Sequence, residues 1–273
     1  MAINIVTKDY AGTNQLSGQI IGGLVQTKYA KGFGDLYLSM QRGKFGLDAQ
    51  YKLVNGNSYG ESSRIANHPL GNNRIHYNDE TGQKSFGITH DYRLGMNYAF
   101  SKNHRLDVAY TGQWDKTNSN SRTTGSSISG MHHDSHEYLH NVDVNYSLPF
   151  GLTLNGSYTY YRTPQQQVLD GTMHTDESMS ETERNLTSGS EQTINKWMFT
   201  ADQTHSLAHG WGLSYGVKGQ FTSNKSYQTT IDKDGTILPD GTSSVDNNER
   251  IWNIYAGFST VSYTHLRAHE TRS

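Results

Sequence analysis

A short stretch of the sequence gathers four histidines and two carboxylates. They are His132, His133, His136, His140, Asp134 and Glu137. Imidazole and carboxylate groups bind Zn or Cu, so the stretch is a candidate metal site. Histidines four positions apart converge on a helix, but this stretch begins an alternating, strand-like pattern in which that geometry is not available. We therefore expect no metal site, and interpret the histidines as polar residues near the end of a strand.

A second candidate is the run Asp232-Lys233-Asp234-Gly235-Thr236, which opens like a calcium-binding loop. Ile237 occupies the position where such a loop needs a glycine for its sharp turn, and Ser243 stands where the closing glutamate belongs. Because Asp and Gly are also the usual residues of tight turns, the run predicts a β-turn instead.

The remaining sequence offers little for catalysis. We find no nucleophile–base set, no phosphate-binding loop and no spaced pair of carboxylates. The chain has no cysteine, which excludes disulfides and thiolate metal sites. Its net charge of −2 provides no overall positive potential that would attract nucleic acid. We expect no catalytic residue, no cofactor, no metal and no nucleic-acid partner, and infer a protein that is not an enzyme.

The composition narrows the fold class. Only 33% of the 273 residues are hydrophobic and the mean hydropathy is −0.75, against roughly 45–50% apolar residues in a soluble domain. No stretch reaches the ~18 apolar residues of a membrane helix, and 18 Tyr, 4 Trp and 8 Phe disfavour disorder. A soluble β protein or a transmembrane β-barrel remains. In the barrel only every second residue faces lipid.

Apolar residues then alternate with polar ones along most of the chain. From Phe45 to Leu53, every second residue is apolar while Gly, Asp, Gln and Lys stand between them. In a strand this pattern places all the apolar side chains on one face. Similar patterns recur at 35–42, 92–100, 106–115, 141–148, 152–160, 197–201, 211–221 and 252–258, with a further strand near 20–29. The sequence thus predicts about ten strands.

The connections alternate in length as well. Short turns at Gly43, Lys102, Pro149 and His209 separate long polar segments at 56–87, 119–134, 163–191 and 224–249. Outer-membrane barrels have short periplasmic turns on one rim and long extracellular loops on the other, whereas a sandwich would mix the lengths and a solenoid would repeat one. We predict an all-β, antiparallel up-and-down transmembrane β-barrel in the cell outer membrane.

Tyrosine and tryptophan gather near the strand ends, as expected of the aromatic girdles of such a barrel. The girdle residues would be Trp114, Tyr158, Tyr160, Tyr161, Trp197, Trp211 and Trp252. Between the girdles, we expect Phe45, Leu47, Leu106 and Val144 on the convex, lipid-facing surface.

The run Ala2-Ile3-Asn4-Ile5-Val6-Thr7-Lys8 resembles the end of the plug domain of TonB-dependent outer-membrane receptors. The strands after it are similar to the barrels of Bacteroidota receptors of this type, and the resemblance extends from Ala2 to Thr260. It implies a barrel of about 22 strands around a plugged lumen, of which about ten are present. We expect the end of a plug at 1–8, and an incomplete barrel, open at both edges, at 9–260.

The resemblance also implies the activity. Such a receptor takes up a scarce nutrient (a siderophore, glycan, peptide or vitamin) through a gated lumen. Its partners would be outer-membrane lipid, the nutrient, and a periplasmic energy-coupling protein that acts through the missing N-terminal part. Two alternatives stay open: a structural or adhesive barrel, and a barrel enzyme such as a lipase or protease.

The last residues depart from the pattern. After Phe258 the alternation fails, and Ser262 to Thr271 resembles a translated sequencing-adaptor read-through. We expect residues 261–273 to be a non-native tail outside the fold; an ordinary polar loop is the alternative.

Overall fold

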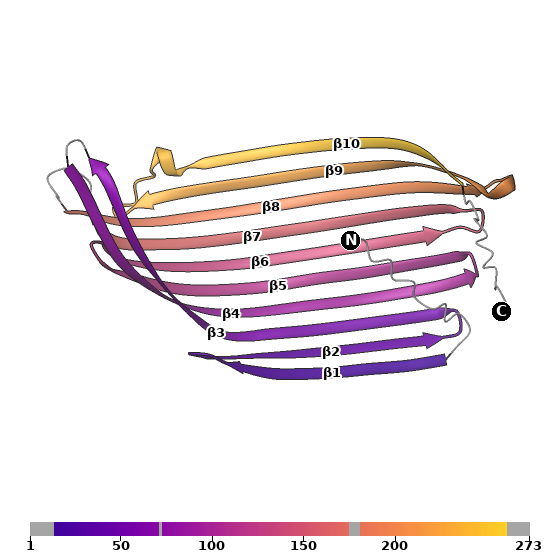
Figure 1. Ribbon diagram of the computed structural model, residues 1–273, viewed down its shortest axis with the longest axis horizontal. Helices are drawn as coiled ribbons and strands as arrows, with labels where there is room; N and C mark the ends of the chain where they lie inside the picture. Colours follow the sequence, from indigo (N-terminus) through magenta and orange to yellow (C-terminus); the bar gives the residue numbers. More distant parts are fainter. Residues whose placement is uncertain (1–13, 71–72, 175–180, 261–273) are drawn as a thin grey trace, which may run out of the picture.

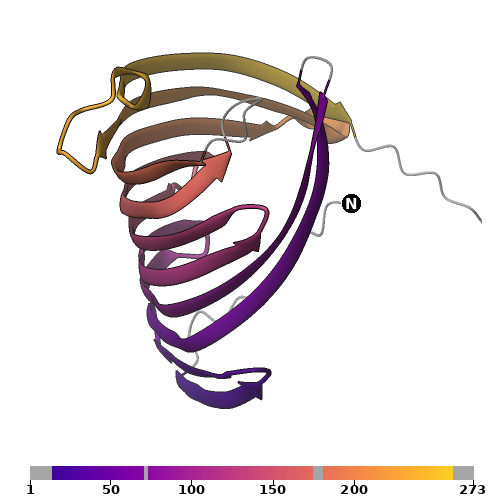
Figure 2. The same cartoon turned by 90° about the vertical axis from the view of Figure 1, so that its left-hand side faces the viewer.

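The computed structural model describes residues 14–70, 73–174 and 181–260, which form one antiparallel sheet of ten strands in sequence order (Figure 1). The strands are β1 (Asn14–Gln26), β2 (Ala30–Arg42), β3 (Phe45–Leu70), β4 (Asn73–Ser101), β5 (His104–Gly125), β6 (Ile128–Ser147), β7 (Leu152–His174), β8 (Glu181–Ser206), β9 (Trp211–Asp232) and β10 (Ser243–Thr260). The sheet is strongly curved, and β1 and β10 are its two open edges (Figure 2). The predicted all-β, up-and-down architecture and the strand number are confirmed.

The expected plug end at 1–8 and the expected tail at 261–273 lie outside the described residues. Among the described residues, helix is limited to two short 3-10 turns, Ala208–Gly210 and Pro239–Gly241. No helix there is long and apolar enough to cross a membrane.

Short turns fix the register that separates the two faces of the sheet. Gly43 turns β2 into β3 with a φ of 59°, a conformation that glycine adopts without steric cost, and so pairs Arg42 with Phe45. In this register Phe45 lies opposite Tyr98, and Leu47 opposite Met96. A slip of the pairing by one residue would move every side chain of the strand to the other face. The observed register keeps the apolar residues of both strands on one face, so the turn and the alternation specify the same pairing.

One face of the sheet, the apolar face, carries Phe45, Leu47, Leu106 and Val144 together, as expected. None of the described apolar side chains is buried: Val144 is 37% exposed, Leu94 48% and Ile254 87%. A soluble protein would cover such a surface, because contiguous exposed apolar area is unfavourable in water. The apolar face therefore suits hydrocarbon, and we call its apolar stretch the apolar band.

Most of each long polar segment, where it is described, is paired strand and not irregular loop, which corrects the predicted long extracellular loops; an irregular connection remains between Asp232 and Ser243. β3 and β4 stay paired up to Leu70 and Asn73, and β5 and β6 up to Thr123 and Ser129. Threonine-rich polar segments can continue a strand, since the ladder satisfies their backbone groups whatever the side chains are. We call these parts of the strands, polar on both faces, the extensions. The extension of β3 and β4 sweeps across one end of the sheet (Figures 1 and 2).

The apolar band shifts along the strands from one edge of the sheet to the other. Following the paired residues across the sheet, Leu53 of β3 lies in one row with Arg162 of β7 and Asp246 of β10. A row of paired residues perpendicular to the strands thus begins inside the apolar band at β3 and ends outside it at β10. This drift is what tilted barrel strands produce, because the membrane plane then cuts each strand at a different residue.

Candidate functional site

Tyrosine and histidine pair across strands where the apolar band meets the extensions. The Tyr51 hydroxyl lies 2.6 Å from Nδ1 of His90 on β4, and the Tyr110 hydroxyl 2.7 Å from Nδ1 of His140 on β6. The His90 ring also lies 5.0 Å from that of Trp114. Such rings combine an apolar body with a polar tip, which suits the boundary between hydrocarbon and water.

The opposite edge of the band, beside the short turns, repeats the arrangement. Nε2 of His104 lies 2.7 Å from the Tyr146 hydroxyl, and Nε2 of His205 lies 3.1 Å from the Tyr215 hydroxyl. All four tyrosine–histidine pairs lie on the apolar face. The structure therefore has two girdles, in which histidine complements the tyrosine and tryptophan that the sequence predicts.

One expected girdle residue lies elsewhere. Tyr161 is paired with Leu139 and Ile194 on the opposite face, and its hydroxyl contacts Glu137 at 3.5 Å. Its neighbour Tyr160 is on the apolar face, stacked with His140. Two consecutive residues of a strand point to opposite faces, so only one of this pair can belong to a girdle.

The second face, the polar face, is crossed by paired charges and hydrogen bonds. Nε of Arg93 donates to Asp48 at 3.0 Å, and Thr89 donates to Asp115 at 2.6 Å. Gly95 stands directly opposite Asp48, and a side chain there would collide with the carboxylate. The glycine thus leaves room for Asp48 to lean towards Arg93.

Beside this ion pair the polar face is hollowed. A hollow of about 350 Å³ is lined by Gln50, Lys52, Asp91, Arg93 and Gln113, among others. The hollow lies over β3, β4 and β5, and its lining presents charges of both signs together with amide groups. Such a lining can bind a polar ligand through donors and acceptors at once.

The predicted histidine cluster is divided between the two faces. His132, His136 and His140 project on the side of the apolar face, whereas His133 and Glu137 project on the polar face. In the described part of the chain, no three His, Asp or Glu side chains are placed to hold a metal ion. Nδ1 of His136 is buried without a hydrogen-bond partner.

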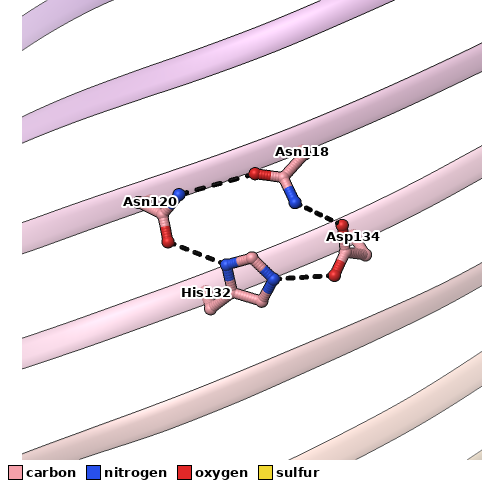
Figure 3. A network of polar contacts seen from close by, with 4 residues as sticks. All are labelled: Asn118, Asn120, His132 and Asp134. Carbon is pink, nitrogen blue, oxygen red and sulfur yellow. Dashed lines mark hydrogen bonds and ion pairs between the residues drawn. The ribbon is translucent and has the colours of Figure 1, made fainter.

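His132 and Asp134 do meet, in a closed cycle with two asparagines of β5 (Figure 3). Asn120 donates to Asn118, and Asn118 donates to Asp134 at 2.6 Å. Nε2 of His132 lies 2.7 Å from the Asp134 carboxylate, and Nδ1 lies 2.7 Å from the Asn120 amide oxygen. Both ring nitrogens face oxygen acceptors, so a ring that carries both protons satisfies the whole cycle.

This cycle lies in the extensions of β5 and β6, beyond the girdle residue Trp114 and outside the membrane-spanning stretch. Burial by itself raises the pKa of the Asp134 carboxyl, but hydrogen bonds from Asn118 and His132 outweigh burial and hold that pKa below its ordinary value. The cycle therefore braces a two-strand extension by charge-assisted hydrogen bonds.

The run from Asp232 to Thr236 folds as the predicted β-turn. The Asp232 carboxylate accepts hydrogen bonds from the backbone N–H of Asp234 at 3.0 Å and of Thr236 at 2.9 Å. The backbone N–H of Gly235 donates to the Asp232 carbonyl at 3.1 Å, and Gly235 has a φ of 79°. The carboxylate thus serves the turn itself.

The sequence reasoning missed the cross-strand partners. Asp48 and Arg93 are 45 residues apart and Asn118 and Asp134 are 16 apart, so neither pair has a spacing that marks a site. Hairpin register is the one signal that could have found the second pair: a turn at Ser126 and Ser127 places Asn118 opposite Asp134.

A match to a family model agrees with this architecture. Residues 150–263 match the model of the outer membrane protein beta-barrel family. Among solved structures, the chain is similar to the ferric yersiniabactin uptake receptor FyuA from Yersinia pestis, with 10% identity over 84% of this chain and 34% of that chain and a TM-score of 0.47. It is similar to the siderophore receptor PiuA from Acinetobacter baumannii, with 8% identity over 92% of this chain and 46% of that chain and a TM-score of 0.33.

A third similar structure is the outer membrane protease OmpT from Escherichia coli, with 12% identity, 91% of this chain and 94% of that chain covered, and a TM-score of 0.28. The chain spans about a third of FyuA and less than half of PiuA. No curated protein matched the sequence. With its apolar band, two girdles and matched segment, the chain forms an incomplete β-barrel of the outer membrane.

Proposed function

We propose that this barrel belongs to a ligand-gated receptor that takes up a scarce nutrient (a siderophore, glycan, peptide or vitamin) through its lumen. The observation that carries the proposal is the polar face, which lies back to back with the apolar band. Its hollow beside Lys52, Asp91 and Arg93 offers charges of both signs to a passing ligand. Uptake would be driven by a periplasmic energy-coupling protein, which the resemblance at Ala2 to Lys8 implies.

The test is uptake by intact cells that express the native protein. Labelled ferric siderophores, cobalamin, oligosaccharides and peptides are supplied one class at a time, with and without the energy-coupling protein. We expect one class to accumulate only when both proteins are present. Accumulation that needs no coupling protein would favour a passive barrel, and no accumulation of any class would favour a structural or adhesive one.

The same cells can test for an enzyme. Fluorogenic ester and peptide substrates added outside should stay intact at the rate of cells that lack the protein. Faster hydrolysis would contradict the proposal in favour of a barrel hydrolase.

Substitution of residues that line the hollow gives a finer test of the proposed ligand path. Lys52→Gln and Arg93→Gln should each reduce uptake of the transported class, because each removes a cation from the polar face. Lys102→Gln in a short turn is the matched control and should leave uptake unchanged. Equal uptake by all variants would show that this hollow is not on the ligand's path.

A further inference from the structure

One row of paired residues on the polar face changes from charged to apolar as it crosses the sheet. From β3 to β8 its members are Lys52, Asp91, Gln113, Leu139, Tyr161 and Ile194. The first four of them line the hollow beside Arg93. Neighbouring strands are about 4.8 Å apart, so the row is roughly 24 Å long. A single ligand on this wall can therefore meet its charged part and its apolar part at once.

The charged end of the row consists of Lys52 and Asp91, which are half-buried and directly opposite each other across β3 and β4. Directly opposite residues have Cβ atoms about 5 Å apart. Within the described ranges, neither side chain makes a hydrogen bond or an ion pair. The neighbouring Arg93, by contrast, is held by Asp48 at 3.0 Å. One ammonium and one carboxylate of the hollow thus remain available to a ligand that carries both charges.

The apolar end of the row consists of Leu139, Tyr161 and Ile194, which we call the apolar row. All three side chains are half-buried on a face that is otherwise mostly polar. The Tyr161 hydroxyl already has a partner, since it lies 3.5 Å from Glu137, and the body of its ring is left for apolar contact. Covering the apolar row with an apolar group removes its surface from water and so favours binding of that group.

We propose that the hollow and the apolar row select short zwitterionic peptides, of two or three residues, that carry large apolar side chains. This inference rests on the uptake function proposed above and names its substrate class. The ammonium of the peptide binds Asp91, its carboxylate binds Lys52, and its side chains lie over Leu139 and Tyr161. The ends of a dipeptide are roughly 7 Å apart, a span that two side chains on neighbouring strands can bridge.

The same chemistry disfavours the other classes of nutrient. A neutral glycan carries no charge for Lys52 or Asp91, and its hydroxyl groups gain nothing from the apolar row. An anionic complex would place its charge beside the Asp91 carboxylate without a cation to match it. A binding site rejects a ligand that leaves its charged groups without partners, so the hollow discriminates by charge as well as by contact.

The test measures peptide affinity of the native protein, purified from outer membranes in detergent, by isothermal titration calorimetry. The probes are Phe-Leu-Phe with free ends, the same peptide with an acetylated N-terminus and an amidated C-terminus, and Ser-Gly-Ser. Lys52→Gln and Asp91→Asn each remove one charge, and Leu139→Ser shortens the apolar row. The matched controls are Lys102→Gln in a short turn and Leu169→Ser, which is also on the polar face but in the extension of β7. Heat-modifiable migration checks that each variant is folded.

Phe-Leu-Phe should bind, and both the end-blocked peptide and Ser-Gly-Ser should bind at least about ten-fold more weakly. Lys52→Gln and Asp91→Asn should each weaken Phe-Leu-Phe about ten-fold or more, the scale of a lost hydrogen bond between charged groups. Leu139→Ser should weaken it about five-fold or more through lost apolar contact. The two control variants should bind it as the wild type does. The proposal is overturned if Phe-Leu-Phe binds no better than the other two probes, or if Lys52→Gln, Asp91→Asn and Leu139→Ser all bind it as the wild type does.

The uptake experiment separates a failure of this inference from a failure of the proposed function. Cells that accumulate a siderophore, cobalamin or an oligosaccharide, with a purified protein that does not bind Phe-Leu-Phe, would overturn the peptide assignment and leave the uptake function in place. Binding of Phe-Leu-Phe with the expected losses in the variants, but without accumulation of any class by cells, would support the site and overturn uptake.

Discussion

The hydroxyl of Tyr110 lies 2.7 Å from Nδ1 of His140 on the neighbouring strand, at the edge of the apolar band. The His140 ring is stacked between those of Tyr110 and Tyr160, each with its centroid 6.1 Å away. A hydrogen bond and two ring contacts therefore join β5, β6 and β7 at a single level. The same pairing of tyrosine with histidine recurs between β3 and β4, where Tyr51 meets His90.

Tyr110→Phe removes the hydrogen bond and keeps the ring. We expect the free energy of unfolding to fall by about 1 kcal/mol, the usual net contribution of one hydrogen bond. Urea unfolding of the protein in liposomes, followed by the loss of heat-modifiable migration, measures the change. His140→Phe and the double variant complete a double-mutant cycle. A coupling energy of zero between Tyr110 and His140 would contradict the assigned contact.

The assignment of faces predicts a sharp contrast between two adjacent residues. Val144 is on the apolar face, and Asn145 is on the polar face opposite Asn155. Val144→Arg should destabilise the protein by roughly 2–4 kcal/mol, because it places a charge at mid-depth in the hydrocarbon. Asn145→Arg, the control, should cost far less. Equal effects of the two variants in the same urea assay would refute the lipid-facing orientation of Val144.

Most of the strand architecture could be predicted from local sequence. The alternation from Phe45 to Leu53 is visible within nine positions, and the Gly43 turn fixes the pairing of its hairpin. The extensions could not be told from loops in the sequence, because their Thr, Ser and Asn residues give no difference in hydropathy between the two faces of a strand. A strand that is wet on both sides carries no such alternation.

The contacts between strands could not be predicted in the same way. The sequence predicts both Tyr160 and Tyr161 as girdle residues. Only the pairing of Tyr161 with Leu139 shows that the Tyr161 side chain lies on the polar face. The split of His132 and His133 between two faces follows from the same two-residue period.

The cycle around Asp134 should respond to acid. Its carboxyl has a pKa lowered from the ordinary 3.8, so its contribution to the stability of the β5–β6 extension is present above that ordinary value and is lost as the pH falls through the lowered pKa. Hydrogen exchange of peptides covering residues 118–134 measures this. Protection should exceed that of Asp134→Asn at pH 5 to 7, and the two should become equal in stronger acid. A difference that persists unchanged at about pH 2, below the usual carboxylate range, would contradict the ionised carboxylate in the cycle.

The open sheet predicts how the 273-residue chain behaves by itself. β1 and β10 are the edges, and their apolar side chains are among the most exposed, with Leu24 at 85% and Ile254 at 87%. An edge strand leaves a row of backbone N–H and C=O groups without partners, and each such group costs several kcal/mol in hydrocarbon, where no water can replace the missing bond. The isolated chain refolded into detergent or liposomes should therefore give no heat-modifiable, protease-resistant species, whereas the native protein from outer membranes should give one. A compact resistant band from the isolated chain would mean that β1 and β10 can pair and close a small barrel, and that the tilt inferred from the drift of the apolar band is compatible with ten strands.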